Sequence, residues 1–313
     1  NVAQTSADTP YLARHVGLGA GVPIEVPMLT VNRLCGSGFQ SIITGAQEIC
    51  LGESSVVLSG GSESMSSAPF AVRDCRWGTT LGKDMALKDT LWEVLTDSYI
   101  GCPMAITAEN LAEQYGLDKE VCDAFAARSQ DLWAAAHAAG RFANEIVPLE
   151  IKTRKGMTVF DTDEHPRAGT TAASLAKLNP MFKKDGTVTA GNASGICDGA
   201  GAVIIASKEA SETHSLEPLA RIVSYAVVGV DPNVMGIGPA PAIRAALAKA
   251  GLTIADMDLI EINEAFAPQA LACAKDLGLD MDKLNTNGGA IAMGHPTGAS
   301  GSRIMGHLAY ELR

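Results

Sequence analysis

The residue best placed for chemistry is Cys35, in the run NRLCGSGFQS at 32–41. An apolar run at 26–34 precedes it and an amphipathic run at 39–51 follows it. The pattern therefore predicts a strand, a tight turn and the start of a helix. A thiol at a helix N-terminus lies among unpaired backbone N–H groups, whose field favours the nucleophilic thiolate. A buried structural cysteine at the junction is the alternative interpretation.

Two more polar clusters follow apolar segments. The first is NEAF at 263–266, after the predicted strand DLIEI at 258–262, and the second is the glycine-dense loop 287–301, which holds His295. Ligands of open α/β sheets bind at the carboxyl ends of strands, so the two clusters and Cys35 are expected to converge. A histidine can activate a cysteine, and Asn263 with His295 could donate to an oxyanion. The alternatives are a loop histidine bonded to backbone and a helix N-cap formed by Asn263 and Glu264.

Composition limits the classes of function. The 313 residues carry 47% hydrophobic side chains, 32 glycines and only 5% aromatics, which is typical of an α/β protein with many tight turns. The net charge of −11 argues against nucleic acid or an anionic membrane as the main partner. The seven cysteines show neither C-x-x-C pairs nor zinc spacing, so we expect reduced thiols and no metal. No apolar stretch reaches the length of a membrane span.

The order of apolar and turn-forming segments indicates an α/β chain with an insertion. Residues 26–61 read as a strand, a helix and a second strand at 55–61, which predicts a parallel sheet, and 66–191 read as an inserted lobe over it. Further strands are predicted at 203–206, 220–230 and 258–262, and helices at 107–115, 119–139, 240–250, 267–277 and 300–312. The small-residue turns at 34–38 and 297–301 both precede helices, as a duplicated core would leave behind.

Together these clusters resemble one family. The segments NRLCGSGFQS, NEAFAPQ and NGGAIAMGHPTGASGSR are similar to the thiolase signatures, in thiolase order. The resemblance extends to GGSESMSSAP at 60–69 and FKKDGTVTAGNASGICDGAGA at 182–202, and so covers essentially the whole chain. Within the family the sequence looks most like the degradative mitochondrial type.

The resemblance implies the thiolase fold, an α/β architecture with a five-layered αβαβα core of two similar halves and an inserted loop domain that covers coenzyme A. It assigns 1–65 and 197–217 to the N-terminal half, 66–196 to the loop domain and 218–313 to the C-terminal half. The first elements of the N-terminal half and the last strands of the C-terminal half are expected to lie outside this sequence.

The resemblance also assigns roles. Cys35 matches the nucleophile that attacks the 3-keto carbon, and its backbone N–H would serve the tetrahedral intermediate. His295 matches the residue that activates the cysteine and stabilises the enolate of the departing acetyl-CoA, and Asn263 holds the water of that oxyanion hole. Six further residues match positions near coenzyme A or the acyl group: Ser194, Met104, Phe182, Phe266, Leu95 and Arg167.

The implied reaction is thiolytic cleavage of 3-ketoacyl-CoA by coenzyme A in fatty-acid β-oxidation. Acyl-CoA and coenzyme A are substrates, and neither a cofactor nor a metal is implied. The family resemblance further implies a homodimer or homotetramer in the mitochondrial matrix, with the peroxisome as second choice.

Two alternatives remain open. One is an acetoacetyl-CoA thiolase (acetyl-CoA C-acetyltransferase) running condensation; those enzymes commonly carry histidine where this chain has Pro103. The other is a non-catalytic acyl-CoA-binding relative, which the intact cysteine, asparagine and histidine disfavour. Thiolases also carry a second cysteine in a C-terminal C-x-G motif, which this sequence does not reach. We therefore expect a fragment, and promote neither Cys197 nor Cys273 to that role.

Overall fold

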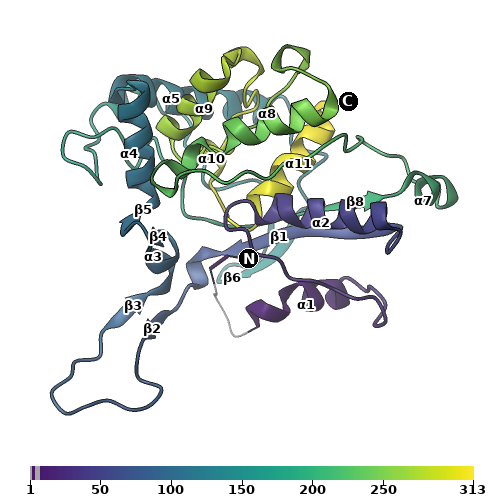
Figure 1. Ribbon diagram of the computed structural model, residues 1–313, viewed down its shortest axis with the longest axis horizontal. Coiled ribbons are helices and arrows are strands. Elements are labelled where there is room, and N and C mark those ends of the chain that lie inside the picture. Colours follow the sequence, from purple (N-terminus) through teal and green to yellow (C-terminus); the bar gives the residue numbers. More distant parts are fainter. Residues whose placement is uncertain (1, 4–7) are drawn as a thin grey trace. The chain divides into compact units, whose positions relative to one another are not determined.

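The computed structural model describes residues 2–3 and 8–313 of the chain, drawn as a ribbon in Figure 1. The chain folds into two compact units, each assembled from segments that are distant in the sequence. Unit 1 comprises Asn1–Met104, Ile196–Leu216 and Pro296–Arg303, and unit 2 comprises Ala105–Gly195, Glu217–His295 and Ile304–Arg313. The division into two halves and a loop domain stays a prediction.

Unit 1 is built on a long two-stranded ribbon. Strand β1 (Val56–Ser64) pairs antiparallel with β8 (Asp198–Ala206), from Val56 opposite Ala206 to Ser64 opposite Asp198. Exposure alternates along most of β8, as expected where one face of a ribbon is covered. Helix α2 (Ser37–Leu51) lies along this ribbon (Figure 1) and ends at Gly52, whose φ of 74° only glycine adopts readily.

The remaining elements of unit 1 are short. They are η1 (Thr9–Tyr11), α1 (Leu12–Gly19), η2 (Met65–Ser67), β2 (Phe70–Val72), β3 (Leu87–Asp89), α3 (Thr90–Val94), β4 (Thr96–Asp97), β5 (Cys102–Pro103) and α7 (Lys208–Thr213). Strands β2 and β3 pair with each other, as do β4 and β5. Helix α11 (Ser300–Glu311) begins in unit 1 and ends in unit 2.

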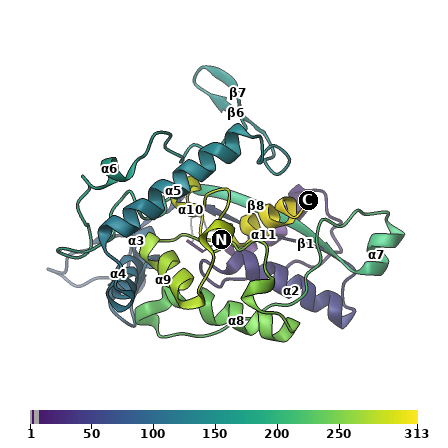
Figure 2. The same cartoon turned by 90° about the horizontal axis from the view of Figure 1, so that it is seen from above.

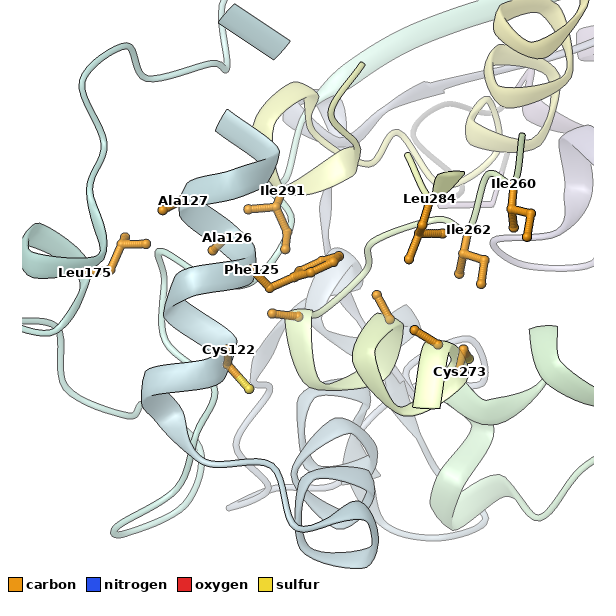
Figure 3. Close-up of a cluster of buried hydrophobic side chains, with 13 residues drawn as sticks. Cys122, Phe125, Ala126, Ala127, Leu175, Ile260, Ile262, Cys273, Leu284 and Ile291 are labelled. Carbon is orange, nitrogen blue, oxygen red and sulfur yellow. The ribbon is translucent and has the colours of Figure 1, made fainter. Parts of the chain in front are cut away.

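Unit 2 is organised around α5 (Lys119–Ala138), which contacts α6 (Ala172–Leu175), α9 (Ala267–Leu277) and α10 (Ala290–Met293) (Figure 2). Asp118 caps α5 by accepting a hydrogen bond from Val121 N at 2.9 Å. The buried side chains of α5 recur at helical spacing, which gives the helix one buried and mostly apolar face. Figure 3 shows Phe125 pointing from that face toward Ile262 and Leu284, in the main hydrophobic core of the unit.

Shorter elements complete unit 2. They are α4 (Met104–Tyr115, its first residue in unit 1), β6 (Leu149–Thr153), β7 (Gly156–Phe160), η3 (Pro232–Ile237), α8 (Pro239–Ala250), η4 (Ile254–Asp256) and η5 (Met281–Lys283). Strands β6 and β7 form an antiparallel hairpin that extends away from α5 in Figure 2. Among residues 2–3 and 8–313, no helix combines the length and the hydropathy of a membrane span.

The helices of the structure agree closely with those predicted from the sequence. All six predicted helices form within three residues of their expected ends, including the two that follow small-residue turns, α2 and α11. The predicted strands at 55–61 and 203–206 also form, as β1 and β8. Amphipathic spacing is a local signal, so it survives whatever the tertiary partners are.

The predicted parallel sheet is wrong for the described residues. Strand β1 pairs antiparallel with β8, and the segments expected as strands at 26–34 and 220–230 belong to no named strand. The segment at 258–262 contributes one parallel bridge, Ile260 with Leu284. A strand needs a hydrogen-bonded neighbour at the right register, and an apolar run indicates only burial, so it does not identify that neighbour.

Candidate active site

Cys35 lies in a tight turn directly before α2, in unit 1. Leu34 adopts a positive φ of 48°, which is uncommon for a bulky residue and marks a constrained turn. The turn is held by Asn32, whose Oδ1 accepts from Leu34 N at 2.9 Å, and by Ser37, whose Oγ donates to Leu34 O at 2.6 Å. Local hydrogen bonds therefore place the cysteine at the amino end of the helix, as predicted.

The protonation of Cys35 differs from the expectation. Its side chain is only partly buried by surface area, yet the atoms crowded around the thiol raise its pKa to about 11 by desolvation. Its own backbone N–H lowers the pKa in part, and the carboxylate of Glu63 raises it further. The net shift is opposite in direction to the one expected from the helix end, because burial outweighs the backbone N–H, and the thiol form of Cys35 is favoured in the protein without substrate.

Glu63 joins strand β1 to the turn that begins α11, within unit 1. Its carboxylate is 2% exposed and accepts hydrogen bonds from Thr297 Oγ1 at 2.7 Å and Gly298 N at 3.0 Å. It also accepts from the backbone N–H of Val2 at 2.8 Å. A Cβ on Gly61 would collide with Gly298 O, so the glycine lets the strand approach this turn. The GGSES segment thus fixes the loop that directly follows His295 in the chain.

Asn263 and His295 form a contact in unit 2. Asn263 Nδ2 lies 3.4 Å from Nδ1 and 3.3 Å from Nε2 of His295, whose side chain is almost fully buried. The His295 backbone N–H donates to Gly195 O at 3.1 Å. Asn263 Oδ1 is buried and accepts no hydrogen bond from the residues that the structure describes. The pair can therefore still receive a donor from a ligand or a water.

The helix-cap interpretation of Asn263 and Glu264 is wrong. Helix α9 begins at Ala267, and Gln269 instead accepts from the backbone N–H groups of Ala265 at 3.1 Å and Phe266 at 3.5 Å. Asn263 is thereby left to face His295. Glu264 turns into the interior, where it is 0% exposed.

Glu264 holds three segments of unit 2 together. Its carboxylate accepts hydrogen bonds from Ser129 Oγ at 2.7 Å, Asn285 Nδ2 at 2.8 Å and Ile291 N at 3.1 Å. Ser129 in turn accepts from Gly289 N at 3.0 Å. Glu264 therefore connects the Asn263 segment to the start of the His295 loop. The sequence placed Glu264 beside a candidate residue but gave no sign of this network.

The other predicted residues fall into groups. Phe182 and Phe266 pack against one small core, and Ser194 N donates to Ala265 O at 2.9 Å, all in unit 2. Met104 N donates to Leu95 O at 3.0 Å in unit 1. Arg167 is exposed, and its backbone N–H donates to Gln130 Oε1 at 2.9 Å.

In the described part of the chain, no group of three His, Cys, Asp or Glu side chains is arranged to hold a metal ion.

Comparison with known proteins identifies the family. Residues 1–209 match the thiolase N-terminal domain and residues 216–313 match the thiolase C-terminal domain. The chain is 61% identical over all 313 residues to human mitochondrial 3-ketoacyl-CoA thiolase and spans 79% of that protein. It is 52% identical over 306 residues to an acetyl-CoA acetyltransferase of Syntrophomonas wolfei, covering 96% of this chain and 77% of that protein.

Solved structures agree. The crystal structure of human mitochondrial 3-ketoacyl-CoA thiolase matches with a TM-score of 0.99 at 61% identity, covering 100% of this chain and 79% of that chain. The same human enzyme in complex with CoA matches with a TM-score of 0.97 at 60% identity, covering 100% and 78%. The predicted thiolase-like α/β fold is confirmed. This chain belongs to the thiolase family.

Proposed function

We propose that this protein is an acetyl-CoA C-acyltransferase that cleaves 3-ketoacyl-CoA with coenzyme A, as in fatty-acid β-oxidation. The observation that carries the proposal is the contact between Asn263 and His295 in a chain 61% identical throughout to a 3-ketoacyl-CoA thiolase. Coenzyme A enters as a substrate. The human relative solved in complex with CoA supports this role for the ligand.

The reaction proceeds in two transfers. The Cys35 sulfur bonds to the 3-keto carbon, the bond between carbons 2 and 3 breaks, and its electron pair forms the enolate of acetyl-CoA. The proton taken from the Cys35 thiol is delivered to carbon 2 and completes acetyl-CoA. The thiol of a second coenzyme A then attacks the acyl group on Cys35. Its proton passes to the Cys35 sulfur as the acyl–sulfur bond breaks, which releases the shortened acyl-CoA and restores the thiol.

The protonation of Cys35 requires a base for the first step. Since its pKa is raised to about 11, very little thiolate exists at neutral pH, and His295 accepts the proton as sulfur attacks. Asn263 and His295 stabilise the enolate oxygen, with the unsatisfied Asn263 Oδ1 accepting from a bridging water. The Cys35 backbone N–H donates to the oxygen of the tetrahedral intermediate.

The substrate-binding residues are assigned by family resemblance. We propose that Ser194 contacts the pantetheine arm, that Met104, Phe182, Phe266 and Leu95 line the acyl pocket, and that Arg167 lies at the nucleotide end. The shared packing of Phe182 and Phe266 and the adjacency of Leu95 and Met104 support these assignments. The exposure of Arg167 suits contact with a charged phosphate group.

One observation favours a second function. The 52% identity to an acetyl-CoA acetyltransferase supports acetoacetyl-CoA as an alternative substrate. The higher identity to 3-ketoacyl-CoA thiolases and the proline before Met104 favour the broader degradative activity. Comparing kcat/KM for acetoacetyl-CoA with a medium-chain 3-ketoacyl-CoA decides between them, because only the degradative type prefers the longer chain.

The relatives named mitochondrial support a mitochondrial location. We also propose that the protein is a homodimer or homotetramer. Large apolar side chains at Trp77, Leu81 and Met85, between β2 and β3, are strongly exposed, and self-association would remove them from water.

The test is peptide-mapped mass spectrometry after brief exposure to a 3-ketoacyl-CoA without free coenzyme A. We expect one acyl adduct, on Cys35, that disappears when coenzyme A is added. The exposed Cys50 controls for non-specific acylation, and Cys35→Ser should give no adduct. A folded protein that binds the substrate without any adduct on Cys35 would support the non-catalytic relative instead.

A further inference from the structure

We propose that His165 is a positioning residue for His295. It lies in the segment DEHPR at 163–167, between β7 and α6. The inference rests on the proposed function, because it concerns how the general base of that reaction is held in place. The contacts that support it, with Ala292 and Gly195, lie within unit 2.

His165 contacts two segments that flank His295. Its Nδ1 lies 2.7 Å from Ala292 O, in the last turn of α10 and three residues before His295. A carbonyl oxygen only accepts hydrogen bonds, so Nδ1 carries the hydrogen. The ring also covers Gly195, since a Cβ there would collide with it. Gly195 O accepts the backbone N–H of His295 at 3.1 Å.

The hydrogen bond from His165 satisfies the carbonyl of Ala292, which has no donor within helix α10. Helix α10 has only four residues, and the last carbonyls of a helix have no partner within it. Ala292 is 0% exposed, so water is not available to replace the missing donor. His165 supplies that donor from the side, while its ring presses on Gly195. Both backbone segments next to His295 are therefore held by one side chain.

The consequence for the reaction is specific. If the bond to Ala292 is lost but the ring volume is kept, the turn before His295 loosens while the Gly195 segment stays packed. Transition-state stabilisation then falls, whereas substrate binding changes little, because the Ser194 segment is still supported. If His165 only filled space, replacing it with another ring would not lower kcat while leaving KM unchanged.

The experiment compares His165→Phe with His165→Asn in the full protein. Phenylalanine keeps the ring but cannot donate, and the asparagine amide can donate from nearly the position of Nδ1. The control is His214→Asn, at an exposed position in unit 1. Thiolysis kinetics are measured for each variant, together with amide hydrogen exchange of the peptide covering 290–296.

We expect kcat of His165→Phe to fall about fivefold to tenfold, the worth of one hydrogen bond, with KM for the 3-ketoacyl-CoA within about twofold of wild type. Exchange in 290–296 should rise, and His165→Asn should recover most of both effects. Wild-type kcat and exchange in His165→Phe, or equal losses in both variants, would overturn the proposal. Absence of thiolysis in the wild type would overturn the proposed function instead, and the exchange data would still decide whether His165 holds this loop.

Discussion

Two buried carboxylates organise the residues around the candidate site. Glu63 receives donors from the turn that follows His295 in the chain, and Glu264 receives them from Ser129, Asn285 and Ile291. A carboxylate has four acceptor positions and no donor, so it can gather several N–H and O–H groups at one point. Removing such an acceptor leaves its donors buried and unpaired, which costs more than the bonds themselves contribute.

Glu264→Gln tests how much one buried carboxylate contributes by accepting hydrogen bonds from several donors. The variant keeps the shape but turns one acceptor into an NH2 group facing existing donors, so we expect a loss of about 1–3 kcal/mol of unfolding free energy and reduced thiolysis. Urea unfolding and steady-state rates measure both. The exposed Glu53→Gln is the matched control and should resemble wild type. An unchanged midpoint in Glu264→Gln would show that the buried charge is not needed to satisfy these donors.

Alkylation of Cys35 tests its protonation. Because burial raises its pKa to about 11, the thiolate fraction should rise about tenfold per pH unit between pH 7 and 10. Iodoacetamide labelling of the protein without substrate, followed by peptide mapping, should show that dependence at Cys35. A labelling rate that is already constant below pH 8 would mean that the folded protein stabilises the thiolate after all.

At the residue scale, the sequence predicted the candidate residues that lie in recognisable motifs. It did not predict the residues whose partners are distant in the sequence. Cys35, Asn263 and His295 stand out because each is a reactive or polar type in a turn after an apolar run. Glu264 and His165 do not, since their partners Ser129 and Ala292 lie 135 and 127 positions away. Only tertiary structure makes such pairs visible.

At the scale of elements, helices were predictable, whereas the pairing of strands was not. The spacing of apolar side chains in α5 and α9 is a property of those segments alone. The pairing of β1 with β8 joins segments more than a hundred residues apart, so an apolar run at 55–61 could not reveal an antiparallel neighbour. The similar small-residue turns at 34–38 and 297–301 correctly indicated the starts of α2 and α11.

The small-residue turns allow the first turns of α2 and α11 to pack closely against each other within unit 1. A Cβ built on Gly38 would stand 2.9 Å from both Cα and N of Gly301, which is closer than side-chain carbons approach backbone. Gly38→Ala should therefore force α2 away from the start of α11 and destabilise the protein by about 1–3 kcal/mol. Since Cys35 directly precedes α2, thiolysis should fall with stability.

The control for Gly38→Ala is Gly19→Ala, in α1. Apart from its chain neighbours and the backbone of its own helix, no described heavy atom lies within 4 Å of a Cβ built there, and its φ is not in the left-handed region. It should leave stability unchanged or raise it by up to about 1 kcal/mol, because alanine favours helix. Thermal unfolding of the two variants beside wild type checks the difference. Similar midpoints for both would show that the helices separate without cost.

At the scale of the whole molecule, buried thiols should set the alkaline limit of stability. Burial raises the pKa of Cys122 and Cys273 to about 12, and that of Cys35 to about 11. The thiols of the unfolded chain release their protons near pH 9, the ordinary value. Below that pH both states hold the protons and stability is full. Above it the unfolded state holds fewer protons than the folded state, so stability falls as pH rises toward 11–12.

The double variant Cys122→Ala/Cys273→Ala isolates this effect, because it removes two of the three thiols and leaves Cys35 for catalysis. Each thiol contributes a slope of up to about 1.4 kcal/mol per pH unit above pH 9. The variant should be less stable than wild type at pH 8, since each substitution leaves a small cavity, but should lose less stability between pH 8.5 and 10.5. Urea midpoints across that range measure both slopes. The pKa of Tyr115 is raised by burial, by its hydrogen bond to Asp276 and by Cys273, so Tyr115 is replaced by phenylalanine in both proteins to keep its titration out of the comparison. Parallel curves would mean that the thiols are not what limits the folded protein in alkali, and a converging pair would assign that limit to the cysteine side chains in the interior.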